Sequence, residues 1–103
     1  MITGRSRSYE PENCASAIMG ALARSGNRAP AQELFDQVKK LGHWTDENIW
    51  SEMLSHTINL PPAYHRFAGT TPAQRFLFLR EDGNYEMYDP AWHGRYQNGK
   101  RVV

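Results

Sequence analysis

The sequence lacks the features that most membrane proteins and disulfide-stabilised proteins carry. Cys14 is the one cysteine among 103 residues, which excludes an internal disulfide and a thiolate metal cluster. No apolar run approaches the ~18 residues that a membrane-spanning helix needs, and the polar N-terminal segment has no apolar core of a secretory signal. We therefore expect a cytoplasmic protein without membrane association.

A surplus of one charge is also absent. The chain has 12 Lys and Arg residues against 11 Asp and Glu residues, a formal net charge of +1, and its pI is about 7.9. Domains dedicated to nucleic acid are usually more basic. A role with nucleic acid would therefore depend on where the cations lie, and several lie on the C-terminal segment as Arg95, Lys100 and Arg101.

The chain shows no pattern typical of catalysis or metal binding. The four histidines, at positions 43, 56, 65 and 93, lack the close spacing of zinc ligands on a helix. Cys14 stands at the start of a predicted helix without a surrounding catalytic signature. The glycines are dispersed, so no phosphate-binding loop is indicated. An enzyme is disfavoured, and we expect no catalytic residue, metal or cofactor.

Three helical patterns fill the first half of the chain. They cover residues 13–25, residues 30–41 and a third stretch that begins at Thr45. Asn13 and Thr45 are suitable N-caps because their side-chain oxygens can accept a backbone N–H. The paired prolines at positions 61 and 62 prevent the third helix from continuing.

The apolar spacing then changes from helical to alternating. Residues 76–80 and 85–88 flank an Asp-Gly pair, which predicts a β-hairpin. A short strand at residues 27–29 would complete a three-stranded sheet. We expect a flexible arm over residues 1–12, one domain over residues 13–92, and a C-terminal tail over residues 93–103, part of which docks.

This order of elements predicts an α+β fold of the winged-helix type. A three-helix, helix-turn-helix core would be followed by a β-hairpin that forms the wing. The alternative is a plain three-helix bundle that carries an unrelated hairpin.

Two segments, ENIWSEMLSHTINLPPAYHRF and RFLFLREDGNYEMYDP, carry a resemblance to a known group of domains. The matching positions are Ser55, His56, Asn59 and Pro61, followed by Gly83, Tyr85 and Tyr88. In these positions the chain resembles small winged-helix domains that occur alone or attached to bacterial restriction-type endonucleases. The resemblance covers most of the chain and implies a DNA-binding or defence-linked module. It implies no catalysis, because the nuclease chemistry of such proteins lies in another domain.

Double-stranded DNA is the first candidate partner, bound by a monomer or a homodimer. The outer face of the third helix is predicted to present side chains that can read base edges, while arginines around the hairpin and on the arm contact the backbone. The candidate residues are Asn48, Ser51, Ser55 and Asn59 on the helix, Arg66, Arg75 and Arg80 near the hairpin, and Arg5 and Arg7 on the arm. Three carboxylates on the same helix oppose this hypothesis.

A protein partner is the second candidate, with this chain as an inhibitor or accessory subunit in a phage–host or restriction system. The predicted strand FLFL is apolar on both faces, whereas a half-exposed wing should alternate. The candidate contact residues are Phe76, Phe78, Trp92 and Tyr96. Either these residues cover one another within the chain, or a second protein covers them.

Overall fold

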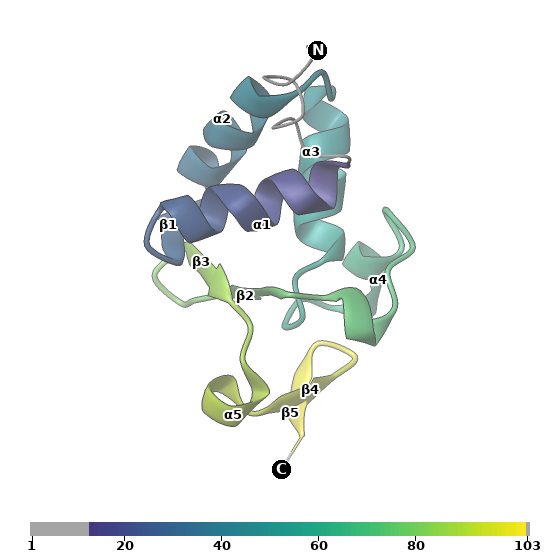
Figure 1. Ribbon diagram of the computed structural model, residues 1–103. Helices are drawn as coiled ribbons and strands as arrows, with labels where there is room; N and C mark the ends of the chain where they lie inside the picture. The colour runs from purple at the N-terminus through teal and green to yellow at the C-terminus, as the bar shows by residue number, and fades with distance from the viewer. Residues whose placement is uncertain (1–12, 103) are drawn as a thin grey trace, which may run out of the picture.

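Three helices and a three-stranded antiparallel sheet form the body of the protein (Figure 1). The computed structural model describes residues 13–102, so the predicted arm with Arg5 and Arg7 lies outside the described residues. In chain order the body contains α1 (Cys14–Arg24), β1 (Arg28–Pro30), α2 (Ala31–Leu41), α3 (Asp46–Ser55), β2 (Leu77–Leu79) and β3 (Asn84–Met87). The prediction of an α+β domain is confirmed.

The predicted capping residues start α1 and α3. The side-chain oxygen of Asn13 accepts a hydrogen bond from the backbone N–H of Ser16 at 2.8 Å. Thr45 Oγ1 accepts one from the backbone N–H of Asn48 at 3.1 Å. Each bond satisfies a donor that the first turn of a helix leaves unpaired, which explains why the sequence locates both helix starts correctly.

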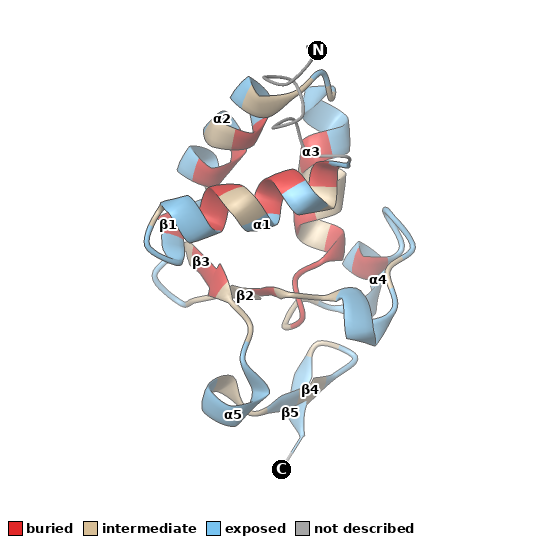
Figure 2. Cartoon of the chain, viewed as in Figure 1, coloured by how far each residue is buried: buried red, intermediate tan, exposed pale blue. Residues whose placement is uncertain are grey.

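The core lies where the apolar faces of the three helices meet the sheet (Figure 2). Its fully buried side chains include Ile18, Leu22, Leu34, Val38, Ile49, Met53, Leu77 and Tyr85. Trp50 stacks on Phe35 with ring centroids 4.6 Å apart. Gly42 leaves room for the Trp44 ring, because a Cβ at this glycine would collide with that ring.

β3 is the central strand of the sheet, with β1 on one side and β2 on the other. Leu77 lies opposite Met87 across the β2–β3 pair, and Ala29 lies opposite Tyr85 across the β1–β3 pair. The backbone N–H of Tyr88 adds a bond to the carbonyl of Phe76 at 2.8 Å. The predicted hairpin and the short strand after the first helix are therefore both present.

α3 is shorter than the sequence pattern indicates. It ends at Ser55, and residues 56–59 then run along the outer edge of β2. The backbone N–H of Leu77 donates to the carbonyl of His56 at 3.0 Å, and Ile58 N–H donates to the carbonyl of Leu77 at 2.8 Å. Pairing with a strand that lies far along the chain competes with the helix, and no local signal reveals it.

The connection from α3 to β2 contains two short elements that the sequence analysis did not predict. They are α4 (Pro62–His65) and the 3-10 turn η2 (Pro72–Gln74). A proline occupies the first turn of each, where the missing N–H removes no hydrogen bond. The paired prolines therefore begin α4, whereas α3 already ends at Ser55.

A small C-terminal unit, residues 90–102, lies at one end of the body (Figure 1). It consists of α5 (Pro90–His93) and a hairpin of β4 (Arg95–Gln97) and β5 (Lys100–Val102). Asn98 and Gly99 form the turn, with φ of 53° and 82°, as two-residue hairpin turns require. The sequence predicts a tail over residues 93–103 and no element within it, so this hairpin was not anticipated.

The longest described helices have 11 residues. Within residues 13–102, none combines the length and the apolar character that crossing a bilayer requires.

Candidate functional site

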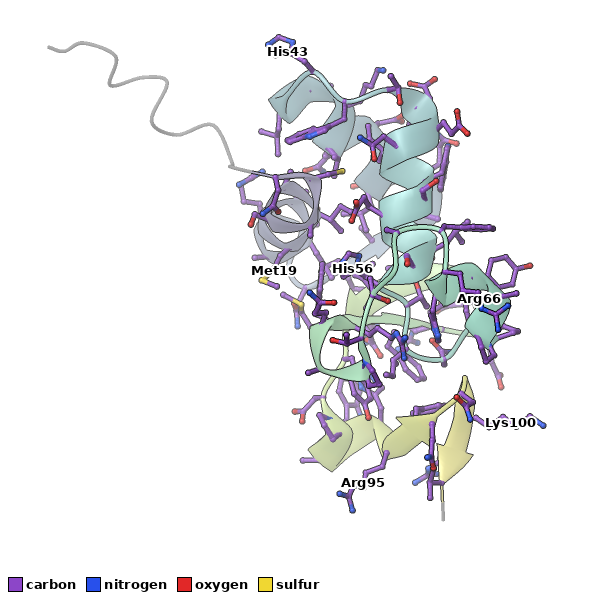
Figure 3. The ribbon with its side chains drawn as sticks, turned by 90° about the vertical axis from the view of Figure 1, so that its right-hand side faces the viewer. Met19, His43, His56, Arg66, Arg95 and Lys100 are labelled. Atoms are coloured by element: carbon purple, nitrogen blue, oxygen red, sulfur yellow. The ribbon has the colours of Figure 1, made fainter. Side chains whose placement is uncertain are left out.

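The outer face of α3 is open to solvent over its first two turns (Figure 3). Asn48 is exposed and Ser51 is half-buried on this face. Together with Phe67 and Ala68 from the following connection, they line a hollow of about 380 Å³. The structure thus brings together two of the four helix residues that the sequence predicted as DNA contacts.

Ser55 does not belong to this face, and its predicted contact with DNA is wrong. The side chain is fully buried. Its Oγ donates to the carbonyl of His65 at 2.6 Å and accepts from the backbone N–H of Ala68 at 3.1 Å. The carbonyl of Ser55 accepts from the hydroxyl of Thr70. Ser55 therefore fastens the α4 connection to the end of α3.

Asn59 also has a structural role in place of the predicted base contact. It lies beyond the end of α3 and beside β2. Its Nδ2 donates to the carbonyl of Leu79 at 2.8 Å, and its Oδ1 accepts from the backbone N–H of Leu79 at 2.9 Å. Both ends of the amide are used within the chain, so the prediction that Asn59 continues the outer face of the helix is wrong.

The three arginines predicted around the hairpin differ in availability. Arg75 donates from Nε to the hydroxyl of Thr70 at 3.0 Å and from Nη2 to the carbonyl of Thr70 at 2.7 Å. Arg80 is paired with Asp82 at 3.1 Å and with Glu86 at 3.4 Å. Arg66 is exposed and, among residues 13–102, makes no such bond. Arg66 is therefore the one of these three that we retain as a candidate contact.

Carboxylates on α3 oppose an approach by DNA, but two of them have partners. Asp46 forms an ion pair with Lys39 at 2.6 Å. The carboxylate of Glu52 lies 3.5 Å from Nδ1 of His56. The same nitrogen lies 2.7 Å from the backbone carbonyl of Glu52 and is the donor of that bond, because a carbonyl can only accept. Glu47 is exposed in the first turn. The helix therefore carries less unpaired negative charge than its sequence indicates.

The predicted apolar contact surface is covered mainly by the chain itself. Phe78 stacks on His93 with centroids 4.1 Å apart and meets Tyr96 edge-on at 5.6 Å. Phe76 packs against the core. Trp92 differs, because it stacks on His93 and remains 63% exposed. Of these candidate partner residues, Trp92 is the most accessible.

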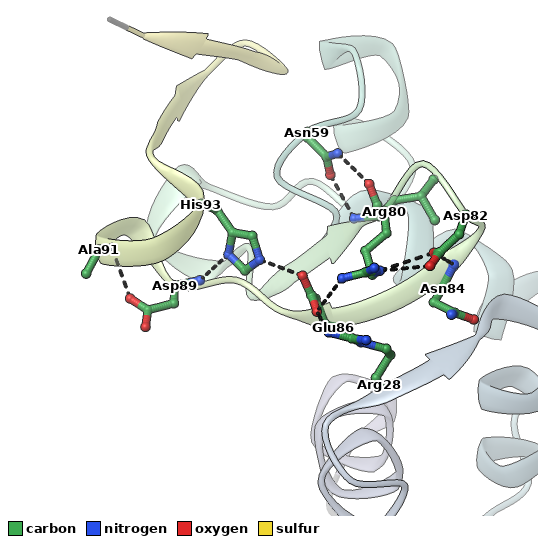
Figure 4. Close-up of polar contacts among 10 residues, drawn as sticks. Arg28, Asn59, Arg80, Asp82, Asn84, Glu86, Asp89, Ala91 and His93 are labelled. Atoms are coloured by element: carbon green, nitrogen blue, oxygen red, sulfur yellow. Dashed lines mark hydrogen bonds and ion pairs between the residues drawn. The ribbon is translucent and has the colours of Figure 1, made fainter.

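A buried carboxylate joins the sheet to the C-terminal unit (Figure 4). Glu86, on β3, is 3% exposed. It accepts from Nε2 of His93 at 2.7 Å and pairs with Arg28 at 3.3 Å and with Arg80 at 3.4 Å. Nδ1 of His93 accepts from the backbone N–H of Asp89 at 2.9 Å, which places the ring proton on Nε2. The imidazole of His93 thus links the C-terminal unit to the sheet, and the hydroxyl of Tyr88 adds a bond to the carbonyl of Gly94 at 2.7 Å.

The surroundings of Glu86 keep it ionised despite burial. Burial alone would raise the pKa of this carboxyl, but the hydrogen bond from His93 and the charges of Arg80 and Arg28 outweigh it and hold the pKa below its usual range. Because His93 already accepts at Nδ1, its ring has no free nitrogen for taking a proton from a substrate. The cluster around Glu86 therefore has a structural role, which is to hold the C-terminal unit against the sheet.

Cys14 is not an activated nucleophile. The thiol is buried, and burial, helped by the nearby charge of Glu52, raises its pKa to about 11. Within residues 13–102, no group of three or more His, Cys, Asp or Glu side chains is arranged to hold a metal ion.

His65 is a buried titratable group at the junction between α3 and α4. Its Nε2 donates to the carbonyl of Thr57 at 2.8 Å. Burial lowers the pKa of His65 below its ordinary value, and the charge of Arg75 acts in the same direction; the bond to Thr57 opposes them in part. The folded state therefore prefers the neutral ring.

We expect the stability of the fold to decline as the pH falls below about 6.5, the ordinary pKa of histidine. The His65 pKa is lower in the folded chain than in the unfolded chain, so the unfolded chain binds the proton first as the pH falls. The free energy of unfolding therefore decreases as the pH falls from the pKa of the unfolded chain to that of the folded chain. Urea unfolding from about pH 7 to about pH 5 measures this. His65→Gln should flatten this decline, because it removes the titrating ring and keeps the other three histidines. An unchanged dependence of the unfolding free energy on pH would contradict the assignment of the decline to His65.

The comparisons with known proteins identify no relative. No protein-family model, no curated protein and no solved structure matches this chain.

Proposed function

We propose that this chain is a small, non-enzymatic winged-helix domain that binds double-stranded DNA in the cytoplasm. The arrangement that carries the proposal is the order helix, strand, helix, helix, strand, strand, apart from the short α4 and η2 between α3 and β2, with β3 between β1 and β2. This order and this sheet are those of winged-helix domains. On this proposal α3 is the recognition helix, the helix that enters the major groove in helix-turn-helix proteins.

The open face of α3 supports this proposal. Asn48 and Ser51 share the hollow beside Phe67. An asparagine can bond the N6 and N7 positions of adenine together, and a serine can contact several bases. Arg66 is exposed and directly precedes Phe67, which lines the same hollow, and an exposed guanidinium suits a phosphate. The resemblance in the α3 and hairpin segments favours a restriction or phage-defence setting.

Fluorescence anisotropy with a labelled random duplex tests the proposal. We expect binding at about 50 mM salt that weakens steeply by about 200 mM, because each phosphate contact releases a condensed counterion. The titration uses the full chain, so that Arg5 and Arg7 are present. The absence of binding at low salt, or binding that does not change with salt, would contradict the proposal.

The role of α3 is tested separately on the tightest-bound sequence selected from a random pool. Asn48→Ala should weaken binding about fivefold or more, because a bidentate base contact contributes at least about 1 kcal/mol. Gln32→Ala is the matched control, since Gln32 is also an exposed amide early in a helix. Equal effects of the two variants would remove α3 from the interface.

A protein partner remains the second candidate, and Trp92 is the observation that favours it. This side chain is 63% exposed and borders a hollow of about 470 Å³ with Phe78, Arg80 and His93. Exposed tryptophans are enriched at protein interfaces. A partner recovered from nuclease-treated lysate by the native chain and lost with Trp92→Ser would support this candidate.

A further inference from the structure

The C-terminal hairpin of β4 and β5 carries a concentrated positive charge. Arg95, Lys100 and Arg101 are all exposed, and residues 94–103 include no Asp or Glu. Within the described chain, none of these three cations takes part in an ion pair. Three cations on two strands of three residues give this hairpin a strongly positive surface.

The hairpin between β2 and β3 has the opposite character. Its turn carries Glu81 and Asp82, and both are exposed. The arginine beside them, Arg80, is paired with Asp82 and Glu86. A wing tip with this charge would be repelled by phosphates. The hairpin that holds the position of the wing is therefore poorly suited to contact DNA.

The register of the C-terminal hairpin sorts its side chains onto two faces. Tyr96 lies opposite Arg101 on the inner face, where Tyr96 packs edge-on against Phe78 at 5.6 Å. Arg95, Gln97, Lys100 and Val102 occupy the outer face, because paired residues share a face and neighbours alternate. The aromatic contact of Tyr96 fixes one face to the body and leaves the other toward solvent.

The turn of this hairpin is seated against the start of α4. A Cβ at Gly99 would collide with the carbonyl of Leu60 and would approach Cα of Pro61 to 3.1 Å. This contact holds Lys100 near the connection that carries Arg66, and the two side chains extend on the same side of the molecule (Figure 3). Lys100 thus continues the side on which Arg66 lies, whereas Arg95 extends toward the other side of the molecule in this view (Figure 3).

We infer that the outer face of the β4–β5 hairpin, through Arg95 and Lys100, contacts the phosphate backbone of the DNA in place of the acidic β2–β3 hairpin. The inference rests on the proposed function. A two-stranded ribbon is narrow enough to lie along or within a groove of B-DNA. Cations on such a ribbon neutralise phosphates and position the domain without reading sequence.

The test compares two double variants that each lower the net charge by two. Arg95→Gln/Lys100→Gln removes the outer-face cations of the hairpin. Arg24→Gln/Lys40→Gln removes two exposed cations at the ends of α1 and α2. Anisotropy titrations of both variants and the native chain on the same random duplex, over a range of salt concentrations, give the affinity and its salt slope. Circular dichroism and urea unfolding confirm that all three are folded.

We expect the hairpin variant to bind about tenfold more weakly or worse at low salt and to lose about two from the salt slope, one for each phosphate contact. The control variant should keep nearly the native slope. If the native chain binds duplex and the two double variants lose affinity equally, the hairpin has no special role. In that case the inference fails and the proposed function stands. If the native chain does not bind duplex, the proposed function fails and the inference falls with it.

Discussion

Glu86→Ala is expected to lower the free energy of unfolding by about 3 kcal/mol, because removing one partner of a buried charge network leaves the others unpaired. The side chain of His93 is 5% exposed and would lose its acceptor. The side chains of Arg28 and Arg80 are 47% and 30% exposed, so water can hydrate both guanidinium groups after Glu86 is removed. The expected loss of unfolding free energy therefore lies at the lower end of the range for broken buried charge networks. Urea denaturation measures the loss.

The same variant should loosen the C-terminal unit more than the body. Hydrogen exchange at the amides of β4 and β5 should accelerate beyond the change in global stability, because His93 anchors this unit to Glu86. Glu81→Ala is the control, since Glu81 is an exposed carboxylate in the neighbouring turn and should change stability by less than about 0.5 kcal/mol. Equal effects of the two variants would show that the buried network contributes nothing.

Leu77→Ala is expected to destabilise the fold by about 3–4 kcal/mol, the range for a fully buried leucine whose surroundings cannot collapse. Leu77 has no exposed surface and is held from both sides. Its backbone bonds to His56 and Ile58 on one edge, and its strand pairs with β3 on the other. These backbone bonds survive the substitution, so the chain around the new cavity is restrained. Chemical denaturation monitored by tryptophan fluorescence measures the loss.

Two further variants test the explanation for Leu77. Leu77→Met nearly conserves volume and should cost less than about 1.5 kcal/mol. Leu79→Ala removes a half-buried leucine from the same strand and should cost clearly less than Leu77→Ala. If Leu77→Ala lowers the free energy of unfolding no more than Leu79→Ala does, the core around Leu77 relaxes into the cavity and the explanation is wrong.

Local signals in the sequence explain the elements that were predicted correctly. Asn13 and Thr45 cap the helices that follow them because each bond closes within three residues. The Asp82-Gly83 turn likewise needs no distant partner, and Gly83 has the positive φ, 88°, that such turns require. The type and order of the elements of the body, from α1 to β3 without α4 and η2, could therefore be predicted from the sequence.

The end of α3 could not be predicted, because the residues that decide it come from β2. Ser55 and Asn59 continue a plausible polar helix face on spacing alone. In the structure, Asn59 pairs with the backbone of Leu79, which is 20 residues away in the chain. Half of the predicted helix contacts were lost for this reason, and the remaining pair, Asn48 and Ser51, lies in the part of α3 that local capping controls.

The C-terminal hairpin has one local signal in the sequence, although no hairpin was predicted there. Asn98-Gly99 is a strong turn dipeptide, but each flanking strand has three residues, too few to show alternation. Burial of Glu86 had no comparable signal, because a carboxylate in a strand is ordinarily expected to face solvent. Its burial depends on Arg28, Arg80 and His93, which come from three other parts of the chain.

The segment that follows α3 also determines how this protein meets other copies of itself. Leu77 and Leu79 direct their outward backbone groups to residues 56–59, and all four groups are bonded there. The opposite edge of the sheet is β1, which is three residues long and ends in Pro30, a residue without an N–H to offer. Within residues 13–102, the β2 edge therefore offers no row of free donors and acceptors to a strand from another chain, and the β1 edge is short and ends in a proline. Both features disfavour edge-to-edge aggregation of the sheet.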